Sequence, residues 1–186
     1  MAIPAHRLFT AEEFLSMGEA GILGEDERVE LLDGEIVPLT PIGPTHAGIV
    51  DRLTRVLARV AADRAILRVQ SPIRLTDLSL PQPDLALLRP REDFYVNAHP
   101  QAGDVLLVVE VADSSVRWDR EVKVPLYARS GVCEVWVVDA GRKEMFVCRG
   151  PEGGRYAEEV AVGRGDVVEP VGVDGAVELS EVFGEL

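Results

Sequence analysis

Cysteine is scarce in this chain of 186 residues, and long hydrophobic runs are missing. The two cysteines, Cys133 and Cys148, lie in strand-like segments, and the chain has no CxxC pair or Cys/His cluster. This excludes the common zinc-site patterns and favours buried free thiols. No apolar run approaches the roughly 20 residues that a membrane-spanning helix needs, and residues 1–9 lack the apolar stretch of a signal peptide. We therefore expect a cytoplasmic protein that does not insert into membranes.

Aromatic residues and lysine are also rare. Aromatics make up 5% of the chain, which is too few for an obvious single-strand nucleic-acid binder that stacks bases on exposed rings. We interpret Trp118 and Trp136 as core or interface residues rather than as base-stacking platforms. The chain has two lysines, Lys123 and Lys143, beside 17 arginines. A GC-rich genome or a thermophilic source would each give this bias, and composition does not separate the two.

Positive charge is limited overall but concentrated in one internal segment. The net charge is −13, and both ends of the chain are acidic. Residues 46–75, in contrast, contain six bases and two acids. On a helix, three of these bases share one face: Arg52, Arg55 and Arg59. Such a stripe could follow a phosphate backbone, although charge at helical spacing more often just faces solvent.

Hydrophobic periodicity and turn signals predict a mixed α/β fold in one domain, with a core over about 27–149 and a C-terminal β extension over about 150–186. The runs 105–111 and 135–139 are continuously apolar, as expected for a parallel pair buried on both faces and joined by a helix. Helices are predicted over 12–17, 45–62 and 117–130, and strands over 29–32, 35–39, 65–70, 73–76, 84–88, 105–111, 135–139, 145–149, 156–162 and 167–171.

Local signals mark the ends of several of these elements. Thr10 and Glu13 have the spacing of a capping box, and Asp33-Gly34 is a two-residue hairpin turn. Pro125 should bend the third helix, and Gly131 should end it. The expected N-cap residues of later helices are Thr45, one of Asp113, Ser114 and Ser115, and Ser180.

Two isolated carboxylates, Asp84 and Glu110, are the main functional signal. Each lies in an apolar, strand-like run, where a buried lone charge needs a cation, hydrogen-bond donors or protonation. Lys123 follows on the third predicted helix. Two acids on strands with an amine nearby are the parts of a metal-dependent phosphodiester hydrolase, since Mg²⁺ needs only one or two carboxylates. A structural ion pair would leave the same pattern.

Four other residues are weaker candidates, each with a structural alternative. Glu30, in the first hairpin, could complete an acidic site or face solvent. His46, at the start of the second helix, could approach a phosphate or be structural. Tyr127 lies one turn after Lys123 and more often would pack in the core. Gln70 ends a predicted strand and could line the site.

These residues resemble the PD-(D/E)XK nuclease superfamily through Pro83-Asp84, Glu110 near the end of an apolar strand, and Lys123. The chain resembles more closely the Uma2-type family of bacterial endonucleases. The likeness runs in order from about residue 9 to 150, roughly three-quarters of the chain. The segments that carry it are 29–36, 43–46, 83–86, 108–115 and 131–139.

The resemblance implies a restriction-endonuclease-like mixed β-sheet core flanked by helices, with an N-terminal helix and hairpin. It implies an endonuclease that uses Mg²⁺ or Mn²⁺ and acts on DNA, with Asp84 and Glu110 as metal ligands and Lys123 as the catalytic lysine. Glu30 or His46 would assist. The superfamily places its lysine two positions after the glutamate, where this chain has Ala112. In this family the lysine of the following helix takes that role.

Two further hypotheses stay open at this point. A nuclease-like module of the same fold could bind DNA or a protein with little or no turnover, as the acidic flanks and Ala112 would allow. The apolar strands 135–139 and 145–149 could instead form the surface of a homodimer. The dimer is compatible with either kind of activity.

Overall fold

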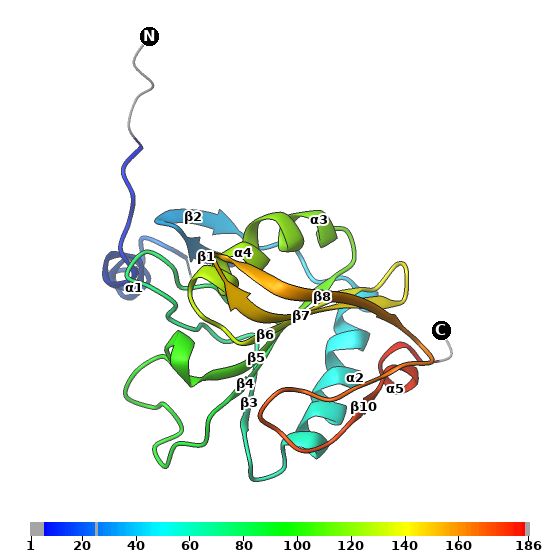
Figure 1. Ribbon diagram of the computed structural model, residues 1–186. Coiled ribbons are helices and arrows are strands. Elements are labelled where there is room, and N and C mark those ends of the chain that lie inside the picture. The colour runs from blue at the N-terminus through cyan, green and yellow to red at the C-terminus, as the bar shows by residue number, and fades with distance from the viewer. Residues whose placement is uncertain (1–5, 25, 185–186) are drawn as a thin grey trace.

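A six-stranded mixed β-sheet lies between two layers of helix in the computed structural model, which describes residues 6–24 and 26–184 (Figure 1). The strand order is β3-β4-β5-β6-β7-β8, and all neighbours are antiparallel except β5 and β6. The predicted mixed α/β fold and the parallel pair are therefore confirmed. The strands are β3 (Ile66–Val69), β4 (Leu85–Leu88), β5 (Val105–Ala112), β6 (Glu134–Asp139), β7 (Glu144–Glu152) and β8 (Arg155–Gly163).

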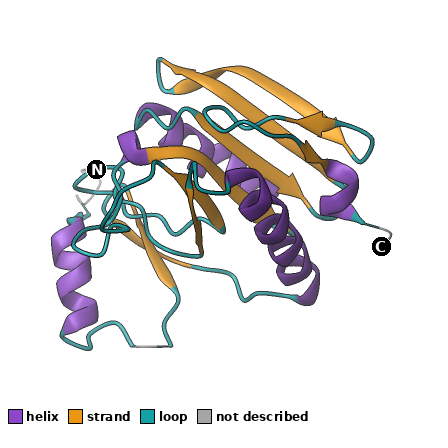
Figure 2. Cartoon of the chain, turned by 90° about the horizontal axis from the view of Figure 1, so that it is seen from below, coloured by secondary structure: helices purple, strands orange, loops and turns teal. Residues whose placement is uncertain are grey.

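The two helical layers cover opposite faces of the sheet, as Figures 1 and 2 show. On one face lie α2 (Pro44–Ala61) and α5 (Leu179–Phe183). On the other lies the crossover between β5 and β6, made of α3 (Val116–Trp118), η2 (Asp119–Lys123) and α4 (Val124–Arg129). Side chains of β5 enter both cores, for example Val109 on one face and Val108 on the other. All eight residues of the strand are therefore buried, and apart from Glu110 its sequence is an apolar run.

The N-terminal part forms the expected helix and hairpin. In α1 (Ala11–Glu19) the Thr10 hydroxyl accepts from the Glu13 amide, and the Glu13 carboxylate accepts from the Thr10 amide, so the capping box is confirmed. The hairpin strands are β1 (Val29–Leu32) and β2 (Glu35–Pro38). Asp33 and Gly34 both have positive φ, +50° and +83°, which the tight turn between twisted strands requires.

The crossover helix contains a π turn where the sequence predicted a bend. Pro125 has no amide hydrogen to continue the helical ladder, and the π turn of η2 ends two residues before it. The turn places Asp119 and Lys123 on the buried side of the helix, although both are charged. Gly131 follows the helix with φ +84°, so the predicted end is confirmed.

Several local predictions were wrong. Residues 73–76 form only isolated bridges, from Arg74 to Gln101 and from Thr76 to Ser79. Thr45 does not cap α2, since Pro44 already occupies the first helical turn and Gly43 is the N-cap. A proline at the first helical position has the right φ and loses no hydrogen bond, so the N-cap lies two residues earlier than predicted.

The C-terminal predictions were partly wrong. Ser180 lies inside α5, whose N-cap is Glu178. The run 167–171 shortens to β9 (Val167–Val168), which pairs with β10 (Val177–Glu178). β8 belongs to the main sheet, and the division of the chain into a core and a C-terminal extension stays a prediction. Within the described part of the chain, no helix is long and apolar enough to cross a membrane.

Burial also corrects two interpretations of surfaces. All six residues of β6 are buried, and so are Met145, Val147 and Cys148 of β7, so these strands do not offer the apolar dimer surface proposed for them. Trp136 is fully buried, as expected for a core aromatic. Trp118 is 45% exposed, so it is not a core residue, and its alternative interpretation as an interface residue stays a prediction.

Candidate active site

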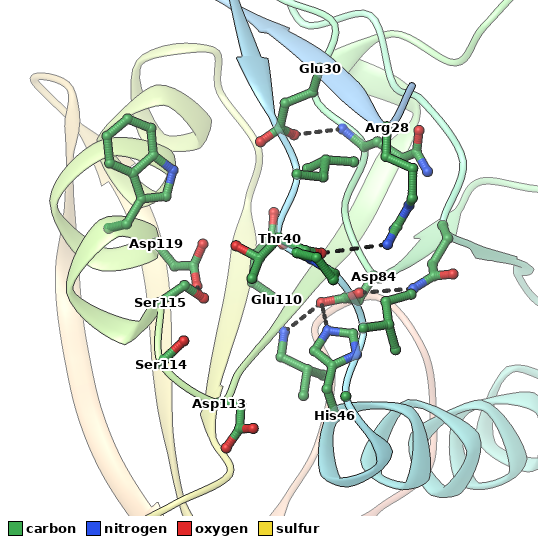
Figure 3. A pocket seen from close by; sticks show the side chains of 18 of the residues that line it. Arg28, Glu30, Thr40, His46, Asp84, Glu110, Asp113, Ser114, Ser115 and Asp119 are labelled. Atoms are coloured by element: carbon green, nitrogen blue, oxygen red, sulfur yellow. Dashed lines mark hydrogen bonds and ion pairs between the residues drawn. The ribbon is translucent and has the colours of Figure 1, made fainter. Parts of the chain in front are cut away.

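Asp84 and Glu110 lie on the same face of the sheet. Asp84 directly precedes β4, and the β4–β5 register pairs Leu85 with Val109. The next step of the ladder sets Asp84 opposite Glu110, on the face covered by the crossover helix. Both side chains line a cavity of about 210 Å³ between the sheet, the crossover helix and the start of α2 (Figure 3).

Three groups hold the Asp84 carboxylate. Its Oδ2 accepts a hydrogen bond from the Val111 amide at 2.9 Å and lies 3.0 Å from Nε2 of His46. Its Oδ1 accepts from Nε2 of Gln70 at 3.3 Å. The hydrogen bond to Asp84 raises the pKa of His46, and partial burial of the ring opposes that rise. Figure 3 shows His46 reaching Asp84 from the first turn of α2.

Glu110 is almost completely buried, with 4% of its surface exposed. Its Oε1 accepts hydrogen bonds from Nζ of Lys123 at 3.2 Å and from the hydroxyl of Tyr127 at 2.6 Å. Burial raises the pKa of Glu110 to about 8; the Lys123 charge lowers it, while Asp119, Asp84 and Glu30 raise it further. Glu110 is therefore a carboxyl whose charge depends on what else occupies the cavity.

Lys123 is clamped between two carboxylates. Its Nζ lies 3.1 Å from Oε1 of Glu30 and 3.2 Å from Oε1 of Glu110, and the residue is 5% exposed. Burial acts to lower the pKa of Lys123, but the charges of Glu110, Glu30 and Asp119 outweigh it, so the pKa is raised. Asp119, four residues earlier on the same helix, is also buried, so Lys123 and Asp119 do not form an exposed surface pair.

Glu30 faces the cavity rather than solvent. It comes from β1 and is 1% exposed, and its Oε2 accepts from the Gln82 amide at 3.0 Å. The hairpin therefore packs its inward side against the crossover helix and supplies a carboxylate to Lys123. The alternation of Glu30 with apolar neighbours in the sequence is typical of a strand with one solvent-facing side, so the pattern alone left both orientations open.

Asp119 was not predicted as part of this cluster. It is 5% exposed, its Oδ2 accepts from Oγ of Ser115 at 2.8 Å, and burial raises its pKa while Lys123 lowers it. Its spacing of four residues before Lys123 was the available signal. The three residues expected to cap the helix line the cavity: Asp113, Ser114 and Ser115. Ser115 occupies the N-cap position, but its side chain forms no capping hydrogen bond.

The cavity offers oxygen ligands for a hard cation. Among the described residues, no group of three or more His, Cys, Asp or Glu side chains is arranged to hold a metal ion. The carboxylates in the cavity that could hold a cation are Asp84 and Glu110. The hydrogen bonds that Glu110 accepts from Lys123 and Tyr127 both end on its Oε1. Two carboxylates with water completing the shell are typical of Mg²⁺ and unlike zinc sites, so the residues present fit Mg²⁺.

Comparisons with known proteins point to one family. A family model described as "Uma2: Putative restriction endonuclease" matches residues 11–180. The search of curated proteins finds no match. The structure is similar to the crystal structure of "a putative nuclease belonging to DUF820" from Anabaena variabilis ATCC 29413, with a TM-score of 0.72 and 17% identity, over 94% of this chain and 97% of the other. At that identity the likeness shows the fold. Because the family model spans most of its length, this chain belongs to the Uma2 family of restriction-endonuclease-like proteins.

Proposed function

We propose that this protein is a Mg²⁺- or Mn²⁺-dependent endonuclease that hydrolyses DNA phosphodiester bonds. One observation carries the proposal: a buried lysine ammonium is held between Glu30 and Glu110, beside an Asp84 carboxylate that is itself fixed by hydrogen bonds, in a cavity lined by polar groups. Buried charges of this kind are costly to keep for stability alone, so their convergence in a cavity supports a catalytic role.

Asp84 and Glu110 would hold the metal. When bound, Mg²⁺ supplies charge neutralisation at the phosphate and a water of lowered pKa. The Val111 amide, Gln70 and His46 orient the Asp84 carboxylate, as partners of metal ligands do in other proteins. Glu110 is oriented in the same way by Tyr127 and Lys123.

Lys123 would place the attacking water or stabilise the charge that develops on the phosphate. Its raised pKa keeps it protonated at neutral pH, so it donates hydrogen bonds and does not take up a proton. Glu30 holds the ammonium from the other side. His46 lies in the first turn of α2, where a phosphate oxygen would meet both its ring and the positive end of the helix.

We propose further that the enzyme works in the cytoplasm, as its free cysteines Cys133 and Cys148 suit, and as a homodimer. The second candidate function is a nuclease-like module that binds DNA or protein without turnover. It is favoured by Ala112 at the lysine position of the superfamily and by the net charge of −13, which opposes binding of a polyanion.

Cleavage of supercoiled plasmid separates the two candidates. The wild type should nick or linearise the plasmid in Mg²⁺ or Mn²⁺ and not in EDTA. Asp84→Ala should lose this activity, and Asp51→Ala, which removes an exposed aspartate of α2, should retain it. Activity that survives in Asp84→Ala would contradict the assigned site. No cleavage by the wild type in either metal would favour the binding module.

A further inference from the structure

Trp118 is an exposed aromatic side chain at the cavity of the proposed active site. It lines the cavity and is 45% exposed, and it directly precedes Asp119, whose carboxylate is buried beside Lys123. In Figure 3 Ser114, Ser115 and Asp119 lie along one wall of the cavity. Trp118 is the last residue of α3, which lies between Ser115 and Asp119 in the chain.

The local structure does not account for the position of the indole. Trp136 is fully buried and its Nε1 donates to Glu134 at 2.8 Å, which is the ordinary fate of a core tryptophan. The hydrogen bonds and cation–π contacts found among the described residues do not involve the Trp118 side chain. Leaving a large ring in water is unfavourable, so a flat apolar partner at this point would be stabilising.

The charges that line the cavity provide little electrostatic attraction for a nucleic acid. Its lining includes five carboxylates, from Glu30, Asp84, Glu110, Asp113 and Asp119, and only Arg28 and Lys123 as permanent cations. Lys123 is already paired with Glu30 and Glu110. A DNA strand that enters here releases few counterions from lysine or arginine contacts, so a contact that does not depend on phosphate charge has to contribute to binding.

We propose that Trp118 is a stacking platform for an unpaired nucleobase, and that the site therefore takes single-stranded or locally unpaired DNA in preference to regular duplex. This inference rests on the proposed function. The faces of a base inside a duplex are covered by its neighbours, so the indole can stack only on a base that is terminal, flipped or in a single strand. Trp118 directly precedes Asp119 in the chain, and it lines the same cavity as the proposed metal ligands Asp84 and Glu110, so a base on the indole would belong to the strand whose phosphate enters that cavity.

Tryptophan fluorescence tests the contact without catalysis. With Ca²⁺ in place of Mg²⁺, a short single strand should quench the exposed Trp118, whereas the buried Trp136 should not respond. The quenching should saturate with a single strand. It should be weak with a duplex of the same sequence and with an abasic strand of the same length. Trp118→Phe should lose the fluorescence change while it keeps most of the affinity.

Anisotropy of a labelled single strand measures affinity independently of tryptophan. Trp118→Ala should bind it roughly tenfold more weakly or worse, as loss of a base–aromatic stack does elsewhere. Phe94→Ala is the matched control, since Phe94 is 67% exposed and lines a separate cavity that shares no residue with this one. The proposal is overturned if Trp118→Ala binds like the wild type, if the abasic strand quenches equally, or if no strand binds saturably.

Cleavage assays keep this inference apart from the proposed function. If the wild type cuts DNA and Trp118→Ala cuts single and double strands in the wild-type ratio, the nuclease stands and the stacking platform fails. If no DNA is cut but the quenching and affinity results hold, the base-binding site stands and the nuclease fails.

Discussion

Lys123, Glu30 and Glu110 form a buried cluster of charged, hydrogen-bonded side chains. Each of the three residues is less than a tenth exposed. Such a cluster contributes little to stability compared with an apolar core, but removing one partner leaves the others buried without a compensating charge. Its effect is to hold an ammonium at one point of the cavity.

Replacement of Lys123 should separate its catalytic and structural roles. Lys123→Arg keeps a positive charge but exchanges a compact ammonium for a broad fork, so we expect most cleavage activity to be lost. Lys123→Ala should lose at least as much and should also destabilise the fold by about 3–5 kcal/mol, because Glu30 and Glu110 are left buried without a cation. Plasmid cleavage and urea unfolding measure the two effects. Full activity of the arginine variant would refute the catalytic assignment.

The raised pKa of Glu110 predicts a pH-dependent stability of the metal-free protein. The pKa of Glu110 is 4.5 ordinarily and about 8 in the fold. Between these two pH values Glu110 is protonated in the folded state and ionised in the unfolded state. The stabilisation is complete below pH 4.5 and is lost as the pH rises through 8, so the free energy of unfolding should fall over this range. In EDTA the melting temperature should drop from pH 5 to pH 8, and Glu110→Gln should flatten the slope. Asp119, whose pKa is raised too, leaves a residual slope.

An exposed carboxylate gives the control for that experiment. Glu158→Gln, on the solvent-facing part of β8, should keep the wild-type pH dependence. Identical slopes for the wild type and Glu110→Gln would show that Glu110 does not titrate in this range.

At the scale of elements, the crossover helix and the start of β6 show how buried polar groups organise this fold. The π turn before Pro125 brings Asp119 and Lys123 to the cavity side. At the other end of the crossover, Glu134 begins β6 with no exposed surface. Its carboxylate accepts hydrogen bonds from three groups, which join β6, β7 and the segment before β10: Nε1 of Trp136 at 2.8 Å, Nε of Arg149 at 2.8 Å and the Val171 amide at 2.5 Å.

Glu134→Ala should therefore loosen the C-terminal segment without touching the cavity. We expect a loss of about 3 kcal/mol in the free energy of unfolding, at the lower end for a broken buried pair because the Arg149 side chain is 28% exposed. Glu158→Ala, an exposed carboxylate of β8, should change it by less than about 0.5 kcal/mol. Urea unfolding gives both values. If both substitutions changed the free energy of unfolding equally, Glu134 would not have the proposed structural role.

At the scale of the whole molecule, the proposed substrate is a polyanion, whereas the protein has a net charge of −13. A divalent cation would offset part of the resulting repulsion. Metal binding should also stabilise the fold. At a concentration 100 times the dissociation constant, the gain is about 2.7 kcal/mol, which corresponds to roughly 5–10 °C in the melting temperature.

We expect this rise in millimolar Mg²⁺ or Mn²⁺, larger at pH 8 than at pH 6, because the metal competes with the proton on Glu110. Asp84→Ala should remove it, and thermal denaturation with and without EDTA measures it. If neither metal changed the melting temperature, Asp84 and Glu110 would be part of a purely structural cluster.

The order of the elements, the parallel β5–β6 pair and the two lone carboxylates could be read from the sequence, because each depends on a local pattern. Alternation, helical periodicity, a capping box and a turn dipeptide are set by neighbours along the chain. Asp84 and Glu110 stood out for the same reason, as charges inside apolar strands. The resemblance to the family added Lys123.

Only the tertiary structure decided which side of each element meets the cavity. Glu30 could have faced solvent, Tyr127 could have been a plain core residue, and Trp118 could have been buried, since a local pattern leaves these orientations open. They depend on how the hairpin, the crossover helix and the sheet pack. Those contacts join residues far apart in the chain, such as Glu30 and Lys123, which are 93 positions apart. Packing between distant segments therefore brings charged side chains that are separated in the sequence into one cavity, with the partly exposed Trp118 in its lining.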